Sequence, residues 1–144
     1  MSTINATNIV ADALVGNTSA TSITVRGEGS ATTVLNQGLS KAWINHSGTG
    51  TIAIRDSFNI ASIVDNSTGT YTQNSTSAMG NNDFTCVFNS GNGAGNSDDT
   101  TNPGNAFSSS HVNTTSQTCM ETMNDGASNV DRDYIGGTWH GDLA

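Results

Sequence analysis

The clearest pattern of apolar and polar positions lies between residues 52 and 64. Apolar side chains occupy one parity of this stretch, namely Ile52, Ile54, Phe58, Ile60 and Val64. Polar side chains occupy the other parity, namely Arg55, Ser57 and Asn59. This period of two predicts a β-strand. Asp56 places a charge on the apolar parity, so we expect the strand to bend near that residue.

Shorter stretches of the same character flank this strand. They predict strands over residues 42–45, 70–73, 84–88, 107–112, 117–123 and 134–142. Turn-forming residues separate them, and Asn124-Asp125-Gly126 predicts a hairpin turn. Some six to eight short strands with loops between them are typical of an antiparallel β-sandwich. The predicted fold class is therefore mainly β, with an antiparallel β-sandwich as the C-terminal domain over residues 41–144.

Residues 1–40 follow a different pattern. The first apolar positions have helical spacing, at Ala6, Ile9, Val10, Ala13 and Leu14. Asn5 is placed as the N-cap and Gly16 lies just past the end. A helix of about ten residues is not stable alone in water, so it must dock on copies of itself or on another protein. We therefore expect an attachment face formed by Ile9, Val10 and Leu14.

Two further elements are predicted before residue 41. Residues 19–26 alternate between apolar and polar side chains and predict a short strand. A second helical stripe follows Ser30, at Ala31, Val34, Leu35 and Leu39. Residues 1–40 are thus predicted to form a short helix/strand segment that serves attachment and oligomerisation.

A long polar loop is predicted over residues 89–105. It consists mainly of Gly, Asn, Ser, Thr and Asp, and it contains Pro103, the chain's only proline. Loops of this length are uncommon in compact domains and are usually either functional or disordered. The candidate receptor-contact residues in this loop are Asn92, Asn96, Asp98, Asp99 and Asn102.

Charge and composition narrow the possible partners. The net charge is −8, with only 4 Lys and Arg among 144 residues, so the basic footprint that nucleic acid or anionic lipid requires is missing. No stretch approaches the ~20 apolar residues of a membrane span, and no secretory signal is evident. We expect a protein made in the cytoplasm, with the thiols of Cys86 and Cys119 reduced. Because only 33% of residues are hydrophobic, the core is thin, and association of copies is expected to add stability.

The sequence contains no evident catalytic constellation, so the protein is not expected to be an enzyme, and no cofactor or metal is expected. The three histidines are far apart in the sequence, and the two cysteines fall within strand patterns. Asn129, Asp131 and Asp133 alternate as in a calcium loop, but the glycine and closing glutamate of such a loop are missing. Trp43 and Trp139 have two interpretations, either packing in a core or subunit interface, or a platform for stacking a sugar.

Residues 41–60 read KAWINHSGTGTIAIRDSFNI. This segment resembles a stretch of tail-fibre-like virion proteins of marine bacteriophages. The similarity continues through residues 63–71 and 77–79, so that it covers about 40 residues, and Gly141-Asp142 resembles the closing strand of that family. After Phe88 the chain departs from the family pattern, because the long Gly/Asn loop replaces a stretch that is usually richer in strand residues.

The resemblance implies a virion appendage protein, assembled in the host cytoplasm and resident in the virion. It implies a homotrimer with an N-terminal attachment part, bound to other virion proteins, and a C-terminal β-sandwich. The function expected is that of a tail fibre or fibre tip that recognises the host surface, with a cell-surface glycan as a candidate partner. The alternatives are a head or tail decoration or connector protein that binds no receptor and, ranked last because no acid pair is evident, a polysaccharide depolymerase.

Overall fold

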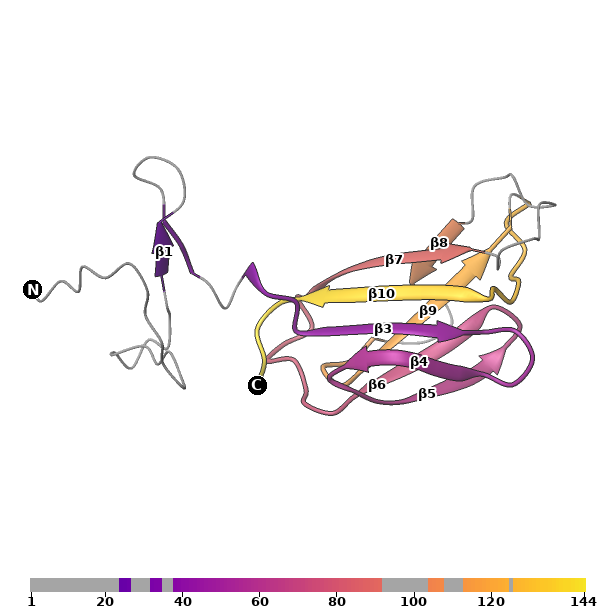
Figure 1. The fold of residues 1–144 in the computed structure, drawn as a ribbon, viewed down its shortest axis with the longest axis horizontal. Helices are drawn as coiled ribbons and strands as arrows, with labels where there is room; N and C mark the ends of the chain where they lie inside the picture. Colours follow the sequence, from indigo (N-terminus) through magenta and orange to yellow (C-terminus); the bar gives the residue numbers. More distant parts are fainter. Residues whose placement is uncertain (1–23, 27–31, 35–37, 92–103, 108–112, 125) are drawn as a thin grey trace, which may run out of the picture. The chain divides into compact units, whose positions relative to one another are not determined.

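The structure is a computed structural model that describes residues 24–26, 32–34, 38–91, 104–107, 113–124 and 126–144. The chain divides into two compact units, Met1–Gly38 and Leu39–Ala144. Figure 1 shows the elements of both units. The predicted helix over residues 5–14, with its attachment face at Ile9, Val10 and Leu14, lies outside the described residues.

The first unit contains a pair of short antiparallel strands. β1 (Thr24–Arg26) pairs with β2 (Thr32–Val34), and Thr24 lies opposite Val34. β1 forms the end of the strand predicted over residues 19–26. The second predicted helix is wrong at residues 32–34, which are extended. Two threonines and a valine are all β-branched, and this preference for strand outweighs the helical spacing of the apolar residues.

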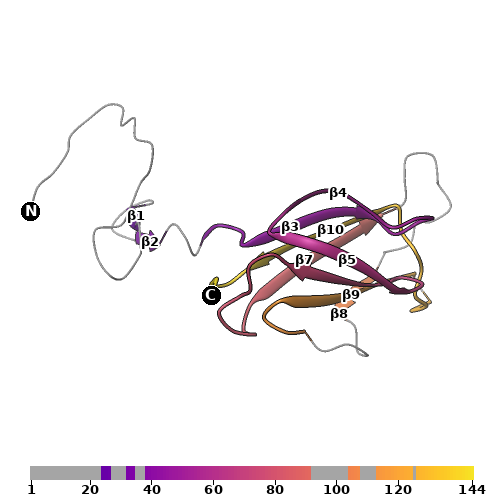
Figure 2. The same cartoon turned by 90° about the horizontal axis from the view of Figure 1, so that it is seen from below.

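The second unit consists of two four-stranded antiparallel sheets (Figure 2). The first sheet has the order β4 (Ala53–Phe58), β3 (Ala42–Ser47), β10 (Tyr134–His140) and β7 (Thr85–Gly91). The second sheet has the order β5 (Ile60–Ser67), β6 (Thr70–Ser75), β9 (Gln117–Met123) and β8 (Gly104–Phe107). The predicted mainly β class with an antiparallel sandwich is confirmed.

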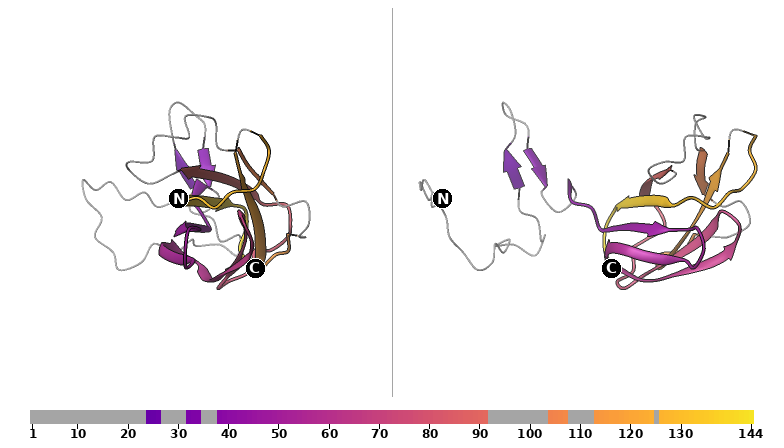
Figure 3. Two further views of the ribbon diagram at one scale, coloured as in Figure 1. Left: turned by 90° about the vertical axis from the view of Figure 1, so that its right-hand side faces the viewer. Right: turned by 45° about the vertical axis from the view of Figure 1, so that its right-hand side comes forward.

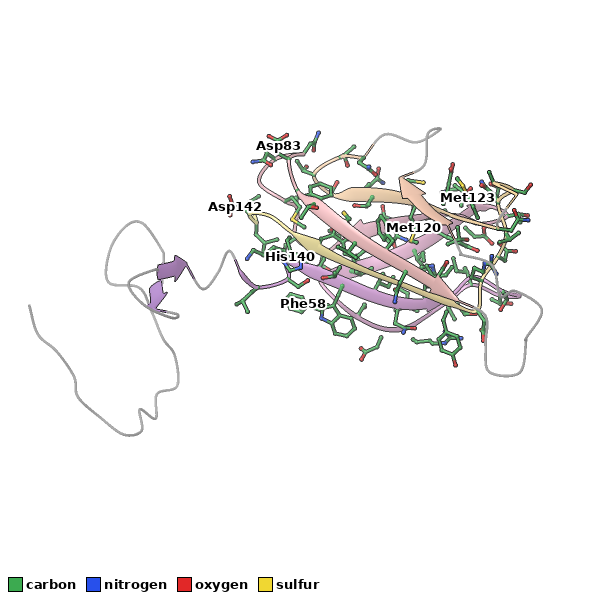
Figure 4. All side chains as sticks on the ribbon, turned by 90° about the horizontal axis from the view of Figure 1, so that it is seen from above. Phe58, Asp83, Met120, Met123, His140 and Asp142 are labelled. Atoms are coloured by element: carbon green, nitrogen blue, oxygen red, sulfur yellow. The ribbon has the colours of Figure 1, made fainter. Side chains whose placement is uncertain are left out.

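The core lies between the two sheets and is small. Ile135 of β10 is buried against Met120 and Tyr71 of the second sheet. Trp139 of β10 is buried in a second cluster, with Ala42, Ile44 and Met79. Figure 4 shows Met120 between the sheets, whereas Phe58 lies on the side of the first sheet that faces away from the second. Alternate residues of each central strand therefore point into the core.

The strand predicted from residue 52 to residue 64 is two strands in different sheets. A bulge in the pairing of β3 with β4 leaves Arg55 as the extra residue, which agrees with the bend predicted near Asp56. The break between the two strands lies further along, at Asn59, whose φ is 58°. Asp56 remains within β4, and its Oδ1 accepts a hydrogen bond of 2.8 Å from the backbone N–H of Ser57. Asparagine tolerates the left-handed region better than most residues, which allows the chain to change direction there.

Two other predicted elements differ in part from the structure. The chain does reverse after Asn124, whose backbone N–H donates to the Ser128 carbonyl at 2.9 Å. The returning segment pairs with the end of β9 through an isolated antiparallel bridge between Met123 and Asn129, so the predicted turn is present. It does not connect two paired strands, because the next strand, β10, belongs to the other sheet. β8 covers residues 104–107 and thus begins earlier than the strand predicted over 107–112, of which residues 108–112 lie outside the described residues.

The sandwich has two distinct ends, as Figure 3 shows. At the proximal end the chain leads from Leu39 into β3, and the backbone N–H of Lys41 donates to the Trp139 carbonyl at 2.8 Å. At the distal end lie the turns that follow β3, β5 and β9. β7 ends and β8 begins at this distal end, since Gly91 pairs with Tyr134 and Gly104 pairs with Met123.

Candidate binding groove on the outer face of the first sheet

An exposed apolar row crosses all four strands of the first sheet on its outer face. Phe58 lies opposite Trp43, Trp43 opposite Thr138, and Thr138 opposite Val87. The exposed fractions are 51% for Phe58, 37% for Trp43 and 63% for Val87. The second sheet packs against the other face, so side chains at these alternate positions remain exposed.

A polar row lies beside this apolar row. Asp56 lies opposite Asn45, Asn45 opposite Gly136, and Gly136 opposite Asn89. Because Gly136 has no side chain, the middle of the row is open down to the backbone. The Asn89 amide leans over this glycine, since a Cβ placed on Gly136 would collide with Asn89 Oδ1.

The two rows enclose a groove along β10. It has a volume of about 450 Å³ and is lined by Trp43, Asn45, Val87, Asn89, Gly136 and Thr138, among others. A second hollow of about 250 Å³ continues toward Tyr134 and shares Asn45, Asn89 and Gly136 with the first. The larger volume, about 450 Å³, is within the range of sites that hold small molecules, roughly 300–1,000 Å³.

An ion pair fixes the distal end of this face. The Arg55 guanidinium lies 2.7 Å from Asp133 Oδ1, and it also lies 4.2 Å from the centre of the Tyr134 ring. Both charged side chains are about one-third exposed, so the pair contributes little to stability, roughly 0–1 kcal/mol. Its effect is to hold Tyr134 against Arg55 beside the second hollow.

The groove is suited to binding rather than to proton transfer. Its side-chain polar groups are the neutral amides of Asn45 and Asn89 and the hydroxyl of Thr138. Within the described part of the chain, no three His, Cys, Asp or Glu residues gather where they could hold a metal ion. The geometry offers hydrogen-bond donors and acceptors beside an aromatic ring.

The stretch that alternates as in a calcium loop has a structural role here. Asp131 Oδ1 accepts hydrogen bonds from the Gly69 backbone N–H at 2.7 Å and from the Tyr71 hydroxyl at 2.8 Å. Asp133 Oδ1 accepts one from the Ser47 hydroxyl at 3.1 Å, in addition to its pair with Arg55. These carboxylates tie the distal turns together.

The titratable groups with shifted pKa values lie away from the groove. Burial lowers the pKa of His46 from 6.5 to about 4, with the nearby charge of Arg55 as a smaller cause. Burial raises the pKa of the Cys86 thiol to about 12. Both cysteines are free, and Cys119 is buried. At neutral pH the Cys86 thiol is therefore protonated and unsuited to nucleophilic chemistry.

The structure separates the two tryptophans, which the sequence left equivalent. Trp139 is 2% exposed and its indole N–H donates to Thr118 Oγ1 at 3.0 Å, so it packs in the core. Trp43 lies on the outer face. Sequence reasoning did not find Asn45, Asn89 or Gly136, although a glycine within a strand can signal close approach of a ligand.

The predicted receptor-contact residues lie outside the described residues: Asn92, Asn96, Asp98, Asp99 and Asn102. Among the described residues, no helix has the length and apolar character needed to cross a membrane. Comparison of the chain with protein-family models, with curated proteins and with solved structures finds no match.

Proposed function

We propose that this chain is a bacteriophage virion protein, a tail fibre or fibre tip that recognises the host surface. The resemblance of residues 41–60 to tail-fibre-like proteins supports this proposal. The observation that carries it is that the two ends of the sandwich differ in what they connect to. The chain arrives from residues 1–38 at the proximal end, whereas both ends of the segment 92–103 are anchored at the distal end.

This difference between the proximal and distal ends fits a protein that is attached to a particle through one end and contacts the host surface through the other. Several connections tie the proximal end together. The Ser40 hydroxyl lies 2.7 Å from the Thr138 hydroxyl, and the backbone N–H of Ala144 donates to the Ala78 carbonyl at 3.0 Å. Gly91 and Gly104, which flank the predicted receptor-contact loop, lie at the distal end of the sandwich, whereas Leu39 leads into β3 at the proximal end.

The trimeric state is part of the same proposal. The buried apolar residues are few, and several large apolar side chains are exposed on the sandwich: Leu39, Trp43, Ile54, Phe58, Val64, Val87, Tyr134 and Leu143. Association would cover part of this surface and add to the stability of a thin core. Light scattering on the purified full-length protein is expected to give the mass of three copies.

The test of the function is binding of the full-length, fluorescently labelled protein to bacterial strains that phages of this type infect. A fibre or fibre tip coats susceptible cells and competes with phage adsorption, and excess unlabelled protein removes the signal. Antibody labelling of particles should place the protein on the tail. Particles labelled without any cell coating would instead favour a decoration or connector protein. Release of reducing sugar from host polysaccharide would favour a depolymerase.

A further inference from the structure

We infer that the outer-face groove of the first sheet binds a neutral pyranose ring of a surface glycan, with Trp43 as the stacking platform. The inference rests on the proposed function, for which it names a ligand class. It assigns recognition to a face of the sandwich in addition to the predicted distal loop.

The aromatic platform and its polar neighbours lie within reach of one sugar. Trp43 and Asn45 are two residues apart on β3, so their side chains leave the same face about 7 Å apart. Thr138 lies directly opposite Trp43 on β10, and its hydroxyl, which is 2.7 Å from the Ser40 hydroxyl, retains a free lone pair that can accept a further hydrogen bond. Apolar C–H groups of a pyranose pack on an indole ring, while its hydroxyls need donors and acceptors at the ring edge.

The opposite wall completes the site. Asn89 on β7 and Asn45 on β3 flank Gly136 on β10. Two strand spacings separate these walls, so their backbones are about 10 Å apart. Within the described residues, neither amide side chain makes a hydrogen bond, which leaves both available to a ligand. The bare backbone of Gly136 lets a ring settle between them.

The charges favour a neutral glycan over an anionic one. The groove walls carry amides and hydroxyls, and the nearest charge in the polar row is the Asp56 carboxylate, opposite Asn45. The cation beside the second hollow, Arg55, is already paired with Asp133. The chain as a whole carries a net charge of −8. A sulfated or uronic acid polymer would meet repulsion here, whereas a neutral hexose would not.

A second copy of the chain fits this groove less well than a sugar does. Phe58 and Val87 stand at the two edges of the exposed row. A flat sheet resting on them would cover the Asn45 and Asn89 amides without supplying hydrogen-bond partners. Burying polar groups without hydrogen-bond partners in this way is unfavourable.

The test uses an array of neutral hexose and N-acetylhexosamine oligosaccharides, probed with the full-length protein, with titration of the best ligand. Trp43→Ala should weaken binding about tenfold or more, and Trp43→Phe should recover part of it because a flat ring remains. Gly136→Val should also weaken binding, since it fills the groove floor and displaces Asn89. Val64→Ala is the matched control, because Val64 is an exposed apolar residue on the other sheet, 46% exposed.

Each outcome decides between the possibilities. Loss of glycan binding in Trp43→Ala and Gly136→Val, with thermal unfolding close to that of the unchanged protein, supports the groove. Unchanged glycan binding in both variants, or no glycan bound by the full-length protein, overturns it. A fall in solution mass for Trp43→Ala would make Trp43 a contact between copies and would also overturn it. The proposed function is tested separately, by whether the labelled protein coats susceptible cells.

Discussion

Asn59 and Ser77 are joined by a reciprocal pair of hydrogen bonds. The Ser77 backbone N–H donates to Asn59 Oδ1 at 2.7 Å, and Asn59 Nδ2 donates to the Ser77 carbonyl at 3.1 Å. The same amide donates to the Lys41 carbonyl at 3.0 Å. The Asn59 backbone is in the left-handed region, at the point where the chain passes from the first sheet to the second. Its side chain connects this point to the segments around Lys41 and Ser77.

Replacement of Asn59 should therefore cost more than an ordinary surface change. Asn59→Ala loses three hydrogen bonds and places in the left-handed region a residue that tolerates it less well than asparagine does, for a loss of about 3 kcal/mol of unfolding free energy. Urea denaturation measures it. Asn59→Gly keeps the conformation and loses only the hydrogen bonds, so it should be less destabilised. Equal losses in the two variants would show that the backbone conformation contributes nothing.

The sequence could not place this corner, because the period of two continues through it. Residues 52–64 alternate as one strand would, and Asp56 is the only position that interrupts the pattern. What ends β4 is a set of long-range contacts from Asn59 to Lys41 and Ser77, which no local pattern contains. The fold class was predictable because alternation and turn residues are local properties.

The hydrogen bond between Trp139 and Thr118 connects the two sheets within the core. Thr118→Val keeps the side-chain volume but leaves the buried indole N–H without its acceptor, and this should reduce the unfolding free energy by about 1–3 kcal/mol. Chemical denaturation followed by tryptophan fluorescence reports the change. Thr85→Val, an exposed change on β7, is the control. A stability equal to that of the unchanged protein would mean that the bond is energetically neutral.

The candidate groove was only partly predictable. Trp43 could be recognised as a candidate sugar platform, but Trp139 had the same standing, since polar residues flank both. Strand register decides between them, because Trp43 falls on the outer parity of β3 and Trp139 on the inner parity of β10. The pairing of Asn45, Gly136 and Asn89 in one row depends on three strands that are distant in sequence.

Gly69, in the turn between β5 and β6, should not accept a side chain. Its φ is 66°, and a Cβ would lie 2.6 Å from the Val130 nitrogen and 2.7 Å from the Thr122 oxygen, both backbone atoms. Backbone strain and overpacking together predict a loss of about 3 kcal/mol for Gly69→Ala. Thermal unfolding measures this loss.

Gly50 provides the matched control for this prediction. Its φ is 67°, but a Cβ there would meet no atom within 4 Å. Gly50→Ala should therefore show the backbone cost alone, about 1–2 kcal/mol. If the two variants lost equal stability, the close approach of Val130 and Thr122 to Gly69 would be without consequence.

His46 is the buried group that should govern stability in mild acid. It is fully buried, with its ring edge-on to Tyr71 at 5.2 Å between centroids, and neither ring nitrogen has a hydrogen-bond partner in the described structure. Arg55 Nη1 donates to the His46 carbonyl at 3.5 Å, and the Tyr71 hydroxyl is bound to the Asp131 carboxylate. The folded protein therefore favours the neutral imidazole.

The unfolding free energy should fall as the pH drops from about 6.5 to about 4. The unfolded chain takes up a proton on His46 near its ordinary pKa of 6.5, whereas in the folded protein the pKa of His46 is lowered to about 4, so its imidazole stays neutral down to that pH. The loss approaches about 3 kcal/mol at the lower limit and does not grow below it. Urea titrations at a series of pH values measure this slope. His46→Leu removes the group, so its curve should be flatter over the same interval. A slope that persists unchanged in His46→Leu would assign the acid sensitivity to the carboxylates instead.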